Sequence, residues 1–224
     1  VAHAERCPLP FLSGMIEDCI GRGKSVQEGG AVYNFTGPQG FGIANMADSL
    51  YAVKTLVFDE HKLSMADLRD ALANNFGKLR TPEEAQEITA DLAKALAADG
   101  IVLNEDQIRS MYQTARTGGI PEEKRLKYEA IRSMLEDVPK FGNDIPEVDA
   151  FARDVAYTYT RPLQYYKNPR GGQFQAGLYP VSANVPLGAQ TGATPDGRYA
   201  GTPVADGVSP SAGRDTHGPT ASAN

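Results

Sequence analysis

At 224 residues, 41% of them hydrophobic, the chain is long enough to bury one sizeable core. Its formal charge is −6 and its 22 Lys and Arg residues are interleaved with acidic ones, which argues against nucleic-acid binding. No apolar run approaches the roughly 20 residues of a membrane-spanning helix, and the N-terminal residues do not resemble a signal peptide. We therefore expect a cytoplasmic globular protein that binds neither membrane nor nucleic acid.

The first predicted element is a short amphipathic helix over residues 10–21, whose apolar residues recur at helical spacing. Cys19 lies on it and Cys7 precedes it, a separation that does not match a compact thiolate pair. In a reducing compartment we expect both to be structural or bystander thiols. The three histidines are scattered and form no HxxxH pattern, so we expect no metal site.

Residues 31–35 form an apolar run of β type that leads through a glycine-rich turn into an amphipathic helix near residues 45–60. Strand, glycine loop and helix is also the order of a phosphate-binding unit, in which Gly37, Gly40 and Gly42 could bring backbone amides to an anion. The Lys-Ser/Thr pair of a P-loop and the spacing of a dinucleotide fingerprint are both missing. We interpret the glycines as a turn pressed against neighbouring backbone.

Four helices are predicted between residues 64 and 138. Their charged residues lie opposite stripes of Leu, Ile and Met, which is typical of a solvated outer face. The helix starts are indicated by N-cap residues, a capping box and a proline: Ser64, Thr81, Asn104 and Pro121.

A last helix is predicted over residues 146–166. Aromatic residues at helical spacing more often fill a core than form a site, so we expect its aromatic cluster to be buried. The cluster comprises Phe151, Tyr157, Tyr159, Tyr165 and Tyr166.

The C-terminal quarter, residues 168–219, contains ten glycines and seven prolines. Apolar residues between these turn formers argue against disorder and predict an ordered, loop-rich region. Within it, Thr194-Pro195-Asp196-Gly197 combines a fixed φ, a turn-forming side chain and a residue free to adopt positive φ. This tetrapeptide predicts a tight turn.

Arg170 and Phe174 flank Gly171-Gly172, where no side chain separates them from the backbone. A permanently charged guanidinium beside an aromatic wall could hold an anionic or strongly polar ligand there. The residues alone leave a second interpretation open, in which Arg170 pairs with a carboxylate and Phe174 fills the core.

Two motifs, YNFTGPQGFGIAN at residues 33–45 and TGATPDGRYAGTPVADGVSPSAGRD at residues 191–215, resemble the lyase and dehydratase branch of the glycyl radical enzymes. The resemblance implies that residues 1–224 are an internal fragment of one α/β domain. The fold implied is a ten-stranded α/β barrel of two five-stranded half-sheets surrounded by helices. Residues 78–138 would be a helical insertion on its exterior.

In that family a glycine stores a radical, a cysteine becomes a thiyl that abstracts substrate hydrogen, and a Glu acts as acid and base. Neither Cys7 nor Cys19 lies in a Cys-x-Glu loop, and no RVxGY-like motif occurs. We therefore expect no catalytic residue, bound cofactor or metal ligand in this chain; the cysteine would lie upstream and the glycine downstream in a parent enzyme. The resemblance also implies a radical S-adenosylmethionine activating enzyme, a homodimer, and anaerobic metabolism in the cytoplasm or a bacterial microcompartment.

The same resemblance makes Arg170 and Phe174 the predicted substrate-binding residues, on a strand that lines the barrel cavity. This pair and residues 78–138 look most similar to isethionate sulfite-lyase, and an Arg fork suits a sulfonate through charge-assisted hydrogen bonds. The predicted reaction is C–S cleavage of isethionate to sulfite and acetaldehyde. Alternatives are dehydration of glycerol or 1,2-propanediol, a lyase that releases trimethylamine from choline, whose cation Arg170 would repel, and a non-catalytic scaffold fragment.

Overall fold

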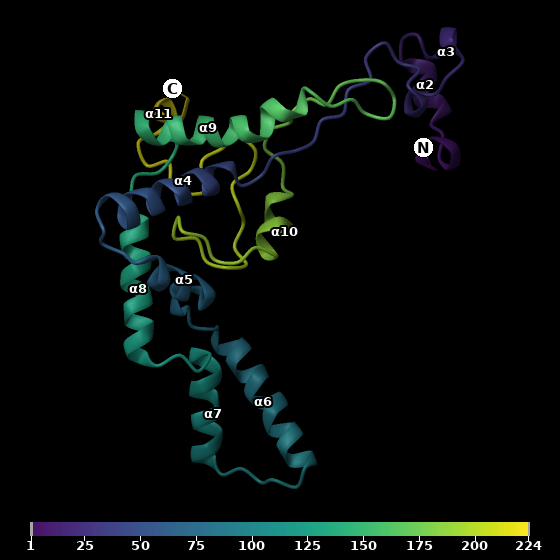
Figure 1. Ribbon diagram of the computed structural model, residues 1–224. Helices are drawn as coiled ribbons and strands as arrows, with labels where there is room; N and C mark the ends of the chain where they lie inside the picture. The colour runs from purple at the N-terminus through teal and green to yellow at the C-terminus, as the bar shows by residue number, and fades with distance from the viewer. Residues whose placement is uncertain (1, 224) are drawn as a thin grey trace. The chain divides into compact units, whose positions relative to one another are not determined.

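The computed structural model describes residues 2–223, which form two compact units. Unit 1 comprises Val1–Ala47, Lys140–Asn184 and Val204–Asn224, and unit 2 comprises Asp48–Pro139 and Val185–Pro203. The chain crosses from unit 1 to unit 2 within α4 (Ile43–Val53) and again at the start of α10 (Asn184–Ala189). Both helices are labelled in Figure 1.

Unit 1 combines several short helices and one long helix, α9 (Pro146–Leu163), with long loops. Its other elements are α1 (Ala2–Arg6), α2 (Pro10–Met15), α3 (Cys19–Arg22), the 3-10 turn η1 (Val26–Glu28) and α11 (Pro219–Ala223). The continuous helix predicted over residues 10–21 is wrong, because α2 ends where Ile16 takes an extended conformation and Asp18, at a left-handed φ of 75°, precedes α3. Asp is one of the few residues that tolerate this conformation.

Unit 2 is built from helices whose starts match the predicted caps. Ser64, Thr81 and Asn104 each accept a hydrogen bond from the backbone N–H three residues later, which confirms three of the predicted starts. The fourth is also confirmed, with Pro121 just before its helix. The elements are η2 (Lys54–Asp59), a π-helical turn that continues α4, then α5 (Met65–Ala73), η3 (Asn75–Gly77), α6 (Pro82–Ala98), α7 (Glu105–Thr117) and α8 (Glu122–Asp137).

The core of unit 2 lies where α5, η3 and α8 meet. Tyr128 of α8 is buried there and donates a hydrogen bond to Asp70 at 2.7 Å. Burial, followed by the contact with Asp70, raises the pKa of Tyr128 to about 12. The other buried residues of this core are Ala52, Leu56, Leu63, Leu68, Ala71, Phe76, Ile131, Leu135 and Val138.

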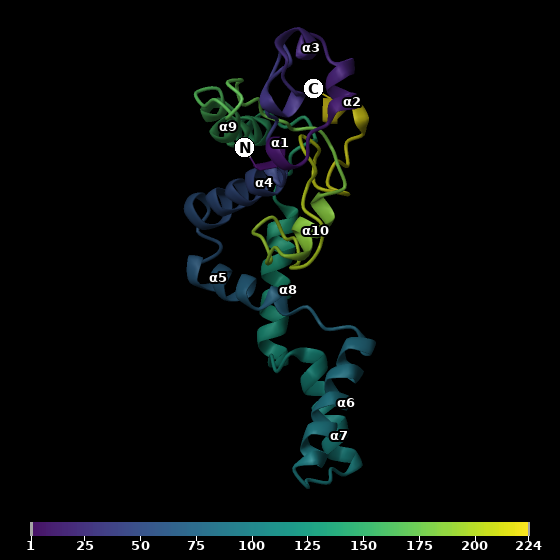
Figure 2. The same cartoon turned by 90° about the vertical axis from the view of Figure 1, so that its right-hand side faces the viewer.

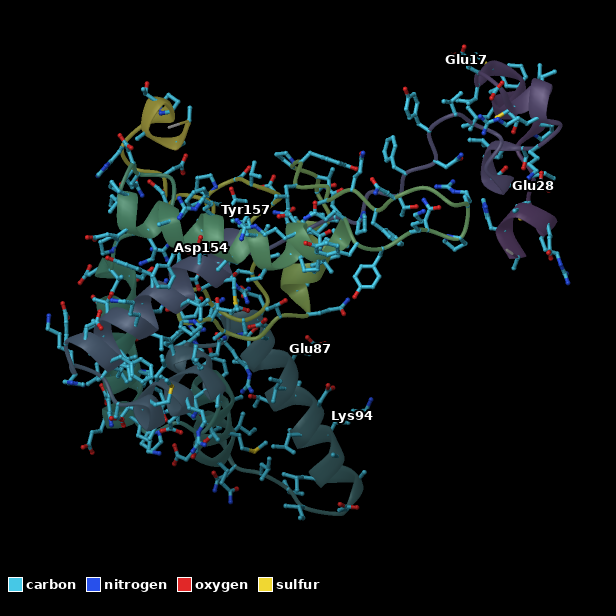
Figure 3. All side chains as sticks on the ribbon, turned by 45° about the horizontal axis from the view of Figure 1, so that its top comes forward. Glu17, Glu28, Glu87, Lys94, Asp154 and Tyr157 are labelled. Carbon is cyan, nitrogen blue, oxygen red and sulfur yellow. The ribbon has the colours of Figure 1, made fainter. Side chains whose placement is uncertain are left out.

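Helices α6 and α7 lie side by side and run antiparallel, as both ribbon views show (Figures 1 and 2). Glu87 and Lys94 project from α6 into solvent (Figure 3), as the amphipathic pattern predicts. Only small residues are buried on this pair: Ala85, Thr89 and Ala115. The hairpin is therefore helical with a solvated outer face, whereas its origin as an exterior insertion stays a prediction.

Among residues 2–223 no β-strand is formed, so the strand expected at residues 31–35 and the barrel are absent from the part that the structure describes. Three isolated bridges stand in their place, and two of them are parallel: Thr36 with Phe174 and Gln39 with Gly177. A strand completes its backbone hydrogen bonds on neighbouring strands. Residues 34–40 find one such neighbour, which explains bridges without a sheet.

The aromatic cluster of α9 is less buried than predicted. Tyr165 is 81% exposed and Tyr166 is 61% exposed, so their assignment to a core is wrong. Both follow the end of α9 at Leu163 and therefore lie off the helical face that the prediction assumed. Tyr157 is also exposed, and the guanidinium of Arg161 stacks on its ring at 3.9 Å.

None of the helices described is long and apolar enough to cross a bilayer. Cys7 is exposed and Cys19 is buried, and both thiols are free. No group of three His, Cys, Asp or Glu side chains in residues 2–223 could hold a metal ion.

The predicted turn at residues 194–197 is confirmed, with Gly197 at a φ of 90° and its N–H donating to the Thr194 carbonyl at 3.0 Å. The next residue, Arg198, is 8% exposed and its guanidinium lies among backbone carbonyls of the same loop. Burial lowers the pKa of Arg198, while Asp196 acts in the opposite direction. The acceptors are the carbonyls of Thr191, Gly192, Tyr199 and Thr202 and the hydroxyl of Thr194.

Replacing Arg198 should therefore unfold this loop. We expect Arg198→Met to lower the free energy of unfolding by about 2–4 kcal/mol, because several buried carbonyls lose their donor. Chemical denaturation would measure the loss. Arg109→Met is the matched control, since that side chain is 75% exposed; an equal effect of both substitutions would contradict the role given to Arg198.

The N-terminus of α5 should make stability depend on acid pH. Lys127 and Ser64 donate hydrogen bonds to the Asp67 carboxylate at 2.6 and 2.8 Å, and these bonds lower its pKa from 3.8. The stabilisation is complete above the unfolded pKa and is lost as pH falls through the lowered folded pKa. We expect Asp67→Asn to flatten the acid limb of a stability curve below about pH 5, with Asp106→Asn, 92% exposed, as control.

Candidate functional site

Two segments far apart in the sequence pair in unit 1 (Figure 1). The Thr36 N–H donates to the Gln173 carbonyl at 3.1 Å, and the Gln175 N–H returns a bond to Thr36 at 2.9 Å. Gly177 repeats the pattern with residues 38 and 40, at 2.8 Å in each direction. The RGGQF segment is thereby fixed alongside YNFTGPQG in a single parallel register.

Gly172 is the point of closest backbone approach between these segments. A Cβ atom added to Gly172 would lie 1.8 Å from the carbonyl oxygen of Asn34. No side chain can occupy that space, so glycine is required for the pairing. The second glycine of the Gly171-Gly172 pair therefore has a packing function that the motif alone did not reveal.

Asn168 connects the two segments through both ends of its side chain. It is 5% exposed; its Oδ1 accepts from the N–H groups of Arg170 at 2.9 Å and Gly172 at 3.1 Å. Its Nδ2 donates to the Asn34 carbonyl and to Thr36 Oγ1, the latter at 3.1 Å. Sequence reasoning missed this residue, although an Asn before a Pro is itself a turn signal.

Arg170 is half-buried and points at the partner segment. Its Nη2 donates to the Phe35 carbonyl at 3.0 Å and to Thr36 Oγ1 at 3.3 Å. Within residues 2–223 it forms no ion pair, so the interpretation in which Arg170 pairs with a carboxylate does not describe the structure. Among the described residues only Nη2 of the Arg170 side chain finds acceptors, so Nε and Nη1 keep donors available to a ligand.

Phe174 lies next to Thr36 in the parallel pairing and is also half-buried. Its N–H donates to the Tyr166 carbonyl at 3.3 Å. The structure thus brings Phe174 and Arg170 onto one short segment, whereas their contact with substrate stays a prediction. Exposed aromatic residues occur on both segments and beside them: Tyr33, Phe35, Tyr165, Tyr166 and Tyr179.

A cavity of about 520 Å³ lies elsewhere in unit 1, lined by α9, α11 and adjoining loops. Leu178 and Val208 contribute to its wall, but neither Arg170 nor Phe174 does. The cavity is therefore a separate feature. The predicted site residues lie on a partly exposed surface of the described chain.

The pairing can be tested at its closest contact. We expect Gly172→Ala to lower the thermal midpoint by several degrees, because a methyl group cannot fit beside the Asn34 carbonyl. Differential scanning calorimetry would measure the midpoint. Gly14→Ala is the control, since nothing lies within 4 Å of a Cβ there; a Gly172→Ala protein as stable as this control would refute the close approach.

Comparison with solved structures finds glycyl radical enzymes with high similarity. A structure concerned with 1,2-propanediol dehydration in Roseburia inulinivorans is 55% identical, with a TM-score of 0.77, over 100% of this chain and 23% of that one. The glycerol-bound form of the B12-independent glycerol dehydratase from Clostridium butyricum is 47% identical, with a TM-score of 0.71, over 100% of this chain and 22% of that one.

Curated relatives include dehydratases and lyases. The probable dehydratase YbiW of Escherichia coli is 37% identical over 94% of this chain and 21% of that protein. The isethionate sulfite-lyase of Bilophila wadsworthia is 31% identical over 80% of this chain and 16% of that protein. The chain thus spans about a fifth of the length of these relatives.

A family model described as pyruvate formate lyase-like matches residues 1–188. This range includes the paired segments that carry Thr36, Asn168, Arg170 and Phe174. Because the match covers most of the sequence, the chain belongs to the pyruvate formate lyase-like family of glycyl radical enzymes.

Proposed function

We propose that this chain is part of a longer glycyl radical enzyme that dehydrates a small vicinal diol, 1,2-propanediol or glycerol. The observation that carries the proposal is the 55% and 47% identity, over the whole chain, to structures of 1,2-propanediol dehydration and of a glycerol-bound glycerol dehydratase. Identity to the isethionate sulfite-lyase is 31% over a shorter range. We therefore prefer a diol to isethionate as the substrate, whereas the sequence analysis favoured isethionate.

The geometry of Arg170 supports a neutral substrate. A guanidinium binds an anion in a bidentate mode with two parallel N–H donors, either Nε with Nη2 or Nη1 with Nη2. In this chain Nη2 already donates to the Phe35 carbonyl and the Thr36 hydroxyl. What remains is suited to single hydrogen bonds, which the hydroxyl oxygen of a diol can accept.

In the proposed reaction a substrate hydrogen leaves one hydroxyl-bearing carbon and the neighbouring C–OH bond breaks. Water departs and return of the hydrogen gives an aldehyde, so 1,2-propanediol yields propanal and water. The radical glycine and cysteine of the longer enzyme would supply the hydrogen abstraction and return. Arg170 would orient a hydroxyl group, and the ring of Phe174 would exclude water from the carbon chain.

C–S cleavage of isethionate to sulfite and acetaldehyde is the second candidate. It is favoured by the positive charge of Arg170, which no carboxylate neutralises within the described residues. Choline cleavage is disfavoured by the same charge, and a non-catalytic scaffold would bind none of these substrates. The radical S-adenosylmethionine activating enzyme, the homodimer and the location in the cytoplasm or a microcompartment stay predictions.

The decisive assay uses the full-length enzyme that contains this segment, activated without oxygen and offered 1,2-propanediol, glycerol and isethionate separately. We expect propanal from 1,2-propanediol and little sulfite from isethionate. Arg170→Gln should raise KM for the diol about 10-fold, the worth of one hydrogen bond to a charged group, with Arg109→Gln as control. Efficient sulfite release without diol turnover would overturn the proposal in favour of the second candidate.

A further inference from the structure

Thr36 shares one hydroxyl oxygen between two donors. Its Oγ1 accepts from Asn168 Nδ2 at 3.1 Å and from Arg170 Nη2 at 3.3 Å. A hydroxyl oxygen has two acceptor lone pairs, so these donors use its full accepting capacity. The Thr36 side chain is thus the link between the buried amide of Asn168 and the half-buried guanidinium of Arg170.

We propose that Thr36 is a specificity-determining residue that acts by positioning Arg170. Together with the Phe35 carbonyl it occupies Nη2, which both bidentate modes of a guanidinium require. The site consequently discriminates against sulfonates and carboxylates and accepts neutral hydroxyl groups. This inference rests on the proposed role of Arg170 in binding substrate.

The position of the Thr36 hydroxyl is fixed before any ligand arrives. The Thr36 backbone is held on both sides, by its N–H to Gln173 and its carbonyl from Gln175. A β-branched side chain has restricted χ1 rotation, and Nδ2 of Asn168, which is 5% exposed, donates a hydrogen bond to the hydroxyl. Displacing Nη2 from Thr36 therefore costs a formed hydrogen bond, and a bidentate anion must bear this cost whereas a diol does not.

A merely structural role for Thr36 makes a different prediction. If the hydroxyl served only to join the two segments, removing it would reduce stability and weaken the binding of every ligand alike. If the hydroxyl occupies Nη2 of Arg170, removing it should strengthen binding of the anion and leave binding of the diol unchanged or weaker. The ratio of the two affinities therefore separates the two roles.

The test measures binding in the full-length enzyme before radical activation, so that it does not depend on turnover. Isothermal titration calorimetry with isethionate and with 1,2-propanediol would compare the wild type, Thr36→Val and Thr36→Ser. Valine keeps the β-branching of threonine but has no hydroxyl to accept a hydrogen bond, and serine keeps the hydroxyl. We expect Thr36→Val to favour isethionate over the diol by about 10-fold relative to the wild type, and Thr36→Ser to restore the wild-type ratio.

The double variant Thr36→Val/Arg170→Gln should lose this gain in relative affinity for isethionate, because it lacks the guanidinium that Thr36→Val frees. An unchanged affinity ratio in Thr36→Val, with a thermal midpoint close to that of the wild type, would overturn the inference. A gain that persists in the double variant would overturn it as well. Failure of diol dehydration is read separately, from the products of the activated wild type, and leaves the affinity ratio as a valid test of Thr36.

Discussion

The parallel backbone pairing between residues 34–40 and residues 172–178 is the constraint on which the candidate site depends. It joins segments so distant that the two asparagines in contact across it are 134 residues apart. Closing so long a loop costs conformational entropy, and the free energy of the four backbone hydrogen bonds of the pairing exceeds that cost by little. The buried Asn168 adds side-chain bonds to both segments, and Gly172 permits the approach that makes them possible.

Local chemistry made the helices of unit 2 predictable. A cap is formed by residues three positions apart, so Ser64, Thr81 and Asn104 carry the information for their helix starts within one turn. The turn at residues 194–197 is equally local. The burial of Arg198 was not predicted, because its acceptors surround the guanidinium only when the loop from residue 191 to residue 202 has folded.

Elements that need distant partners were predicted less well. The apolar run at residues 31–35 has strand-like composition, but composition does not supply the neighbouring strand that a sheet requires. The break between α2 and α3 was also missed, for a different reason: the apolar pattern of a helix continues across Ile16 and Asp18, whose backbones are not helical. At the candidate site, the sequence indicated Arg170 and Phe174, whereas Asn168 and Thr36 became visible only when the pairing brought them into contact.

Charge and geometry act on Arg170 at two different levels. Its acceptors, the Phe35 carbonyl and the Thr36 hydroxyl, are neutral, so they orient the guanidinium without cancelling its charge. The uncancelled charge disfavours cationic ligands whatever their shape. If Arg170 binds substrate as proposed, its occupied Nη2 separates the remaining ligands by the number of parallel donors that they need, because a sulfonate prefers two and a hydroxyl oxygen needs one. In the proposed site the same arginine can thus serve anions or diols, and Thr36, the residue proposed to decide between them, lies on the opposite segment.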